Sequence, residues 1–447
     1  MVVTNSPWYS ALSVFTRRLA PARRRRGVGR RKVFSAQFDG GHGADRSGSV
    51  ALGCDVLERR IVLTASESDF VFSQGAITGY HGSGGVVDIP SKIGGVPVVA
   101  IAANAFAKNA TITGVSIPNS VTFVGNNAFD GDTALASVKL GKGVQAIGDS
   151  AFYGNTALTS VKIRGTVRTI GDYAFFGDTA LTRLTIGKGV QAIGTAAFNG
   201  NTALKEVTIP GSVTTVGNYA FFGNTALRHL KIAKGVESIG DSAFSGNTAL
   251  KEVKIPGSVT TVGSSAFLGN TALTHLKIAK GVQAIGDSAF ERCSALWGVK
   301  LPTSVTKLGA RAFYGNTGLH AADVGNGIAV LEPEVFAQCT ALQAVVIGTG
   351  VTSIGAQAFA GDHVLSWIEF VGSPLPAIHP TAFSGVAPGA IAHVPVQPSL
   401  PVIGEVLVPE IDSPSFLDGT DKYIDDSIDH GFWALKTNVK RPGTGDN

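Results

Sequence analysis

Phenylalanine recurs at intervals of 23 residues through most of this chain, and this period constrains the fold more than any other feature. A strict period over such a length is typical of a repeat protein, in which each unit contacts only its neighbours. An array of this kind builds a long surface and no closed pocket, which favours binding over catalysis. The periodic residues are Phe106, Phe129, Phe152, Phe175, Phe198, Phe221, Phe244, Phe267, Phe290, Phe313, Phe336 and Phe359, and Phe383 follows one residue late.

The repeat unit has an internal pattern that predicts its local structure. The units starting at residues 201 and 247, NTALKEVTIPGSVTTVGNYAFFG and NTALKEVKIPGSVTTVGSSAFLG, differ at four of 23 positions. Val207 and Ile209 are two residues apart, which is the strand period, and the Pro-Gly-Ser sequence after them turns the chain. Val213 and Val216 are three apart, and Phe221 follows as a short helical or 3₁₀ turn would place it.

This pattern predicts a repeat solenoid. We expect a right-handed coil, similar to that of leucine-rich repeat proteins, with one short parallel strand and one short helical or 3₁₀ turn per 23-residue repeat. The inward set of each unit is aliphatic residues and one phenylalanine, and 44% of the chain is apolar while only 15% is charged. No single unit buries enough apolar surface to offset the entropy of ordering it, at about 1–2 kcal/mol per residue. The array must therefore fold cooperatively over several turns.

One polar column follows the phenylalanines at a distance of three residues. It carries mostly Asn or Asp, and Cys at positions 293 and 339. This variation predicts a tight, partly buried turn site, where Asn and Asp bond the backbone and Cys is a small apolar filler. A catalytic cysteine is the less favoured alternative, because the same column is mostly Asn. The two thiols are two repeats apart, about 10 Å, which is too far for a disulfide, and Cys54 adds no further pattern.

The charges are unevenly distributed. The net charge is +5, nine Lys or Arg residues fall within residues 17–32, and the segment from residue 401 onward is acidic. A basic run of this density could contact nucleic acid or an anionic membrane, but we favour a solvated targeting segment. No stretch of 18 apolar residues is present, so we expect no transmembrane helix. Leu57-Glu58, Arg60, Leu63 and Ala65 are similar to a motif near the N-terminus of many large exported bacterial proteins, which implies export.

These patterns divide the chain into four parts. We expect a basic leader over residues 1–65 and an N-terminal cap over residues 66–105, where Gly-rich turns break short apolar alternations. The solenoid with its closing unit then covers residues 106–395, and an acidic, poorly ordered tail covers residues 396–447.

The consensus Leu-x-x-Val-x-Ile-Pro-x-Ser-Val-x-x-Ile-Gly-x-x-Ala-Phe-x-x-Cys/Asn resembles the BspA-type leucine-rich repeat family, over about residues 70–396. The repeats that contain Cys293 and Cys339 match the usual form of that family most closely. The resemblance implies a bacterial protein that is secreted or on the cell surface. It also implies a horseshoe or gently curved solenoid that binds host or matrix proteins in adhesion. We find no clear cell-wall anchor in the tail that would hold such a protein on a surface.

Two columns of the predicted strand face outward because they alternate with the buried apolar residues. One column holds His229, Glu252 and His275, and the other holds Lys231, Lys254, Lys277 and Lys300. Lysines on neighbouring turns, about 4.8 Å apart, lie within one Debye length of about 8–10 Å and would attract a polyanion or an acidic protein. An ordinary solvated sheet face, on which lysine discourages wrong strand pairing, is the simpler interpretation.

The outward columns contain no evident catalytic or metal-binding arrangement. His229 and His275 are two turns apart, about 10 Å, which is too far to share a metal ion. No nucleophile elbow, phosphate-binding glycine loop or His-Glu-x-x-His sequence stands out. We therefore predict a non-enzymatic protein with no cofactor and no metal. It would act outside the cell or on the cell surface, as a monomer, and bind a protein or an acidic surface polymer but no specific nucleic acid. The alternatives are a structural spacer rod with no dedicated ligand, and a polyanion-binding module that uses the lysine column.

Overall fold

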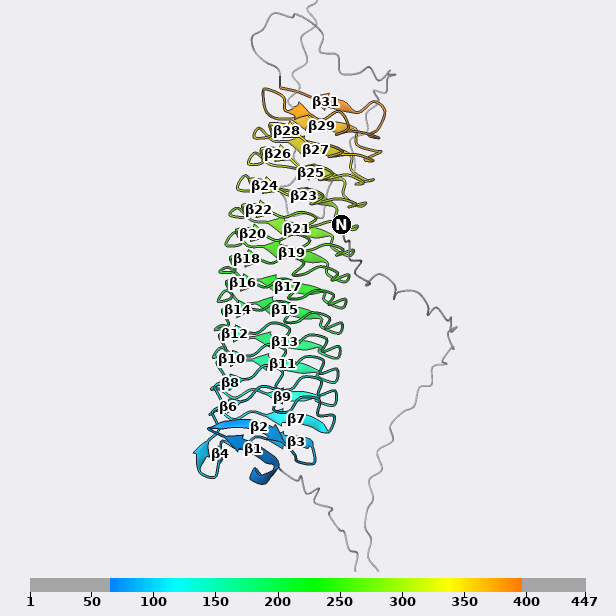
Figure 1. Cartoon of the computed structure of the whole chain (residues 1–447). Coiled ribbons are helices and arrows are strands. Elements are labelled where there is room, and N and C mark those ends of the chain that lie inside the picture. Colours follow the sequence, from blue (N-terminus) through cyan, green and yellow to red (C-terminus); the bar gives the residue numbers. More distant parts are fainter. Residues whose placement is uncertain (1–64, 396–447) are drawn as a thin grey trace, which may run out of the picture. The chain divides into compact units, whose positions relative to one another are not determined.

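Each repeat makes one full turn of a coil, and equivalent strands of successive turns pair in parallel (Figure 1). The computed structural model describes residues 65–395. The predicted basic leader, with its export-like motif, and the predicted acidic tail lie outside the described residues. Within the described part the predicted solenoid is confirmed.

Two series of strands run along the array (Figure 1). The longer strands are β3 (Gly85–Asp88), β7 (Ile112–Ser116), β9 (Ser137–Lys139), β11 (Ser160–Ile163), β13 (Arg183–Ile186), β15 (Glu206–Ile209), β17 (His229–Ile232), β19 (Glu252–Ile255), β21 (His275–Ile278), β23 (Gly298–Lys300), β25 (Ala321–Asp323), β27 (Ala344–Ile347), β29 (Trp367–Phe370) and β31 (Ile391–His393). The shorter ones are β6 (Ala100–Ile101), β8 (Phe123–Val124), β10 (Ala146–Ile147), β12 (Thr169–Ile170), β14 (Ala192–Ile193), β16 (Thr215–Val216), β18 (Ser238–Ile239), β20 (Thr261–Val262), β22 (Ala284–Ile285), β24 (Lys307–Leu308), β26 (Val330–Leu331), β28 (Ser353–Ile354) and β30 (Ala377–Ile378).

The longer strands are those that the alternation of Val207 and Ile209 predicts, and both residues are buried. Val207 pairs with Leu230 and Ile209 with Ile232, which is a register of one repeat. The shorter strands are an addition to the predicted single strand per turn. Each has only two residues, which is too short for alternation to be visible in the sequence.

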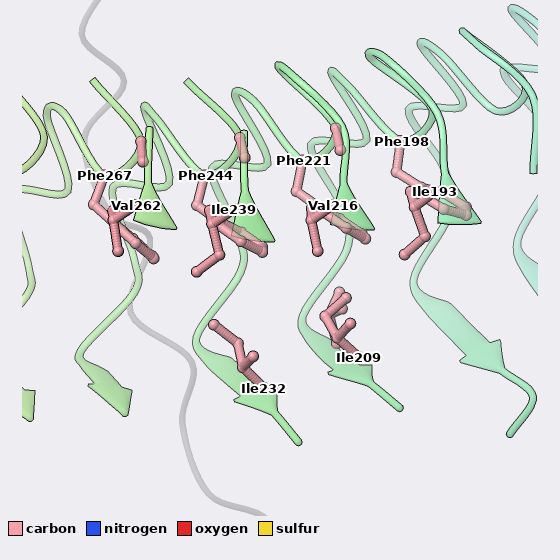
Figure 2. Packing of buried hydrophobic residues seen from close by; sticks show 14 of the residues in the cluster. Ile193, Phe198, Ile209, Val216, Phe221, Ile232, Ile239, Phe244, Val262 and Phe267 are labelled. Carbon is pink, nitrogen blue, oxygen red and sulfur yellow. The ribbon is translucent and has the colours of Figure 1, made fainter. Parts of the chain in front are cut away.

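The periodic phenylalanines form one continuous stack inside the coil, as Figure 2 shows for Phe198, Phe221, Phe244 and Phe267. From Phe106 to Phe383, neighbouring ring centroids are 4.7–5.6 Å apart and the rings are within 12° of parallel. The rings from Phe129 to Phe359 are fully buried. The prediction that the phenylalanine column is the core is therefore confirmed.

The segment around each phenylalanine is a sequence of turns and not a regular 3₁₀ helix. Its N–H groups alternate between two kinds of acceptor. Phe129 N donates to Ala151 O of the next turn at 2.8 Å, whereas Asp130 N donates back to Asn127 O at 3.1 Å. From Phe106 to Phe359, the residue two positions before each periodic phenylalanine has a φ of 52–60°, although none of these residues is glycine. This left-handed conformation is uncommon outside glycine, Asn and Asp, and the inter-turn bonds hold it in place.

The column three residues after each phenylalanine forms a buried hydrogen-bonded ladder. Oδ1 of Asn224 accepts from Asn201 N at 2.7 Å, and Oδ1 of Asn247 accepts from Asn224 N at 2.8 Å. Nδ2 of Asn247 donates to Phe244 O at 3.0 Å. The predicted backbone bonding is confirmed, but the column is fully buried and not partly buried. Cys293 and Cys339 are buried free thiols whose Sγ atoms donate to backbone carbonyls, so they fill the column as small residues.

Three members of this ladder are buried aspartates. Oδ1 of Asp132, Asp178 and Asp362 accepts a backbone N–H at 2.7–2.8 Å, while Oδ2 has no partner. Burial raises the pKa of Asp132 to about 7, that of Asp178 well above its usual range and that of Asp362 to about 9. A protonated carboxyl group resembles the carboxamide that Asn places at the same position. The neutral acid is therefore the form that this column accommodates.

The N-terminal end of the stack is closed by a cap. It contains the 3₁₀ helix η1 (Glu67–Asp69), the antiparallel pair β1 (Phe70–Ser73) and β2 (Ala76–Tyr80), and the antiparallel pair β4 (Lys92–Ile93) and β5 (Val96–Pro97). Phe70 and Tyr80 place their rings 6.5 and 5.5 Å from that of Phe106, which covers the first ring of the stack. No helix within residues 65–395 is long and apolar enough to cross a membrane.

We expect Phe221→Ala to lower the free energy of unfolding by about 3–5 kcal/mol, because it leaves a cavity between two stacked rings. Phe222→Ala is the matched control. Phe222 is the next residue and is 38% exposed, so its replacement should cost less, about 1–2 kcal/mol. Urea denaturation of the full chain measures both values, and equal losses would contradict a core role for the phenylalanine column.

We also expect the stability to fall with rising pH because of the buried aspartates. Their pKa values are raised on folding, so the folded state binds more protons than the unfolded state above about pH 4. Each group therefore lowers the free energy of unfolding by up to about 1.4 kcal/mol per pH unit, until pH reaches its folded pKa: about 7 for Asp132 and about 9 for Asp362.

In the variant that combines Asp132→Asn, Asp178→Asn and Asp362→Asn, the free energy of unfolding should no longer decline as the pH rises. Urea denaturation between pH 4 and pH 9 measures this free energy. The exposed residues Asp149, Asp172 and Asp241, replaced together by Asn, form the control, which should retain the wild-type pH profile. A triple variant that still loses stability as the pH rises would refute the protonated state of the column.

Candidate functional site

The seven candidate binding residues lie on four successive long strands, β17, β19, β21 and β23. All seven side chains are exposed: His229, Lys231, Glu252, Lys254, His275, Lys277 and Lys300. They alternate with buried residues such as Val253 and Ile255, so the strand period determines their direction. The sequence correctly predicted their outward orientation.

Strand register brings the members of each column next to one another. Glu252 pairs with His229 on one side and with His275 on the other, and Lys254 pairs with Lys277. The two histidines are therefore two strands apart, about 10 Å. Within residues 65–395, no group of three or more His, Cys, Asp or Glu side chains is arranged to hold a metal ion.

Two of the four lysines form ion pairs with carboxylates. Lys254 Nζ lies 2.7 Å from Glu252 Oε1, and Lys300 Nζ lies 3.2 Å from Asp323 Oδ2. The hydrogen bond from Lys254 is the main cause that lowers the pKa of Glu252, and the charges of Lys254 and His275 act in the same direction. The lysine column is thus partly neutralised at β19 and β23. For Lys231 and Lys277 the described residues show no such ion pair.

Further basic residues border these strands. The outward columns predicted from the sequence did not include all of them. Lys205, Arg228 and Lys251 are exposed directly before β15, β17 and β19. The sequence pattern that could have identified them is a basic residue directly after the buried leucine in three consecutive repeats, one position before the strand. We define the basic face by eight exposed cationic residues on or beside β15–β21, strands whose own carboxylates are Glu206 and Glu252: Lys205, Arg228, Lys231, Lys234, Lys251, Lys254, Lys277 and Lys280.

The comparisons with known proteins agree with this architecture. The model of the BspA type leucine rich repeat region matches residues 99–227, 174–297, 214–343 and 268–388. No curated protein matches the chain.

Several solved bacterial structures are similar to it. A leucine-rich repeat protein of Bacteroides ovatus is 23% identical with a TM-score of 0.49, and the match covers 71% of this chain and 89% of that one. A leucine rich cell surface protein of Faecalibacterium prausnitzii is 27% identical with a TM-score of 0.42, and the match covers 74% and 93%. The pneumococcal vaccine antigen PcpA is 22% identical with a TM-score of 0.46, and the match covers 72% and 87%.

Because the family model spans well over half of the residues of this chain, the chain belongs to the BspA-type leucine-rich repeat family.

Proposed function

We propose that this chain is a non-enzymatic, exported or cell-surface protein that binds an acidic partner, either a protein or a surface polymer, through its basic face. The observation that carries the proposal is the concentration of eight exposed cationic side chains on or beside β15–β21, strands that carry only two carboxylates of their own. Membership of the family supports a role in macromolecular interaction.

The geometry of the basic face suits an extended anionic surface better than a small ligand. Its cations recur on neighbouring turns, so the positive potential extends along the array and is not concentrated at one point. The side chains of the basic face are exposed, whereas a small-molecule site encloses most of its ligand. Attraction of this kind depends on charge and is screened by salt.

A structural spacer is the second candidate function. The unbroken stack of phenylalanine rings favours it, because every turn is held to the next through the core. A spacer would place no requirement on the charge of the basic face. The two functions therefore differ in what they predict for charge-reversed variants.

We expect the combined change of Lys231→Glu and Lys277→Glu to weaken binding of the full chain to poly-L-glutamate by at least about tenfold. These two lysines are chosen because the described residues show no ion pair for either of them. The double change also places two negative charges on the two strands that flank Lys254, and these charges repel an anionic ligand. Fluorescence anisotropy with a labelled ligand, at low and high salt, measures the effect.

Lys108→Glu with Lys307→Glu is the matched control, because it changes the net charge equally at sites away from the basic face. The control should bind almost as well as the unaltered chain. Equal affinity of all three proteins would remove the basic face as the binding site and leave the spacer function as the better account.

A further inference from the structure

A second surface of the array exposes aromatic side chains that the fold does not require. They occupy the positions two before and one after the stacked phenylalanines. Tyr153, Tyr173, Tyr219 and Phe222 are 38–45% exposed, and Phe176 is half-buried. The ring of Tyr153 stacks on that of Phe176 at 4.9 Å, and Tyr173 and Tyr219 lie 5.9 and 6.0 Å from Phe176 and Phe222.

Other repeats show that small residues serve equally well at these positions. Ser150, Ala196 and Ser242 occupy the position of Tyr173 and Tyr219 with nearly the same φ, 52–53° compared with 56–57°. Ser245 occupies the position of Phe222. Neither the turn nor the core therefore needs an aromatic ring here, and neighbouring exposed rings of this kind commonly mark an interaction site.

The charges around these rings are negative. We define the turn face as the positions three before, two before and one after each stacked phenylalanine. Between residues 126 and 245 it holds five aromatic residues, four aspartates and no lysine or arginine. Two of the aspartates are held rigidly: Asp149 Oδ1 accepts from Asp172 N at 2.9 Å, and Asp172 Oδ1 accepts from Thr195 N at 2.6 Å. A polyanion is disfavoured on this surface, and a cation is favoured.

Further along the array, the same columns contain a cationic side chain of this chain, Arg311. The guanidinium carbon of Arg311 lies 3.7 Å from the centre of the Tyr314 ring. Arg311 also binds Glu291 of the preceding turn at 3.2–3.3 Å and Glu334 of the following turn. Arg311 is two residues before Phe313 and Tyr314 is one after it, so both belong to the turn face. This repeat shows how the turn face accommodates a guanidinium between an aromatic ring and carboxylates.

We propose that the turn face between residues 149 and 222 binds an arginine-containing segment of a partner protein. The partner's guanidinium groups lie on the rings of Tyr173, Phe176, Tyr219 and Phe222 as Arg311 lies on Tyr314. Asp149 and Asp172 supply the carboxylates that complete charge-assisted hydrogen bonds. This site is independent of the basic face, since it has the opposite charge and lies on other segments of each repeat.

The test uses the full chain and a short fluorescein-labelled peptide of alternating arginine and glycine, with fluorescence anisotropy as the readout. The same peptide with citrulline in place of arginine keeps the shape and removes the charge. We expect the arginine peptide to bind at least about tenfold more tightly than the citrulline peptide. We expect Tyr173→Ser with Tyr219→Ser to weaken its binding by about tenfold, and Asp149→Asn with Asp172→Asn to weaken it as well.

These substitutions should leave the fold intact, because native repeats already carry Ser at positions 150 and 242 and Asn at positions 126 and 218 of the same columns. Thermal melting checks this. Tyr314→Ser is the matched control: its ring is already covered by Arg311, so peptide affinity should not change. Equal binding of the citrulline peptide, or unchanged affinity in the Tyr173→Ser, Tyr219→Ser variant, would overturn the proposal. Either result would leave the test of the basic face with poly-L-glutamate unaffected.

Discussion

The burial of each phenylalanine ring between the rings of the two adjacent turns is the interaction on which the other features of the array depend. A ring such as Phe244 is fully buried only because Phe221 and Phe267 cover both of its faces. A single turn would leave those faces in water, and its burial would not offset the entropy of ordering its backbone. The ends confirm this dependence: Phe70 and Tyr80 cover the first ring, whereas the last ring, Phe383, stays partly exposed.

Because the turns stack at a fixed separation, the buried polar groups of each turn must find hydrogen-bond partners on the neighbouring turns. The buried ladder after the phenylalanines satisfies backbone N–H groups with side-chain oxygens, as between Asn201 and Asn224. Asn, protonated Asp and Cys all serve there because each is small and neutral, and Oδ1 of Asn or Asp accepts from the backbone. Asp in place of Asn leaves the stack unchanged but introduces a group that can ionise. Burial raises the pKa of that group, as at Asp362, and so favours its neutral form.

Outside the core, equivalent residues of successive repeats lie next to one another and form columns with the spacing of a parallel sheet. Because the core tolerates many side chains at these positions, surface chemistry varies independently of folding. The long strands and the residues that border them carry the cations of the basic face, and the segments around the phenylalanines carry rings and aspartates. The two surfaces differ in charge, so we expect partners of different chemistry for each.

The sequence alone determined the solenoid, its 23-residue turn, the phenylalanine core and the outward direction of residues such as Lys231, because period and alternation are local properties of the chain. It could not reveal the two-residue strands such as β16, which exist only through pairing with the next turn. It also did not reveal that Lys254 and Lys300 pair with carboxylates, or that Tyr153 and Phe176, a repeat apart, are in contact. Those relations depend on how one turn lies against another and on side-chain conformation, and only the tertiary structure decides them.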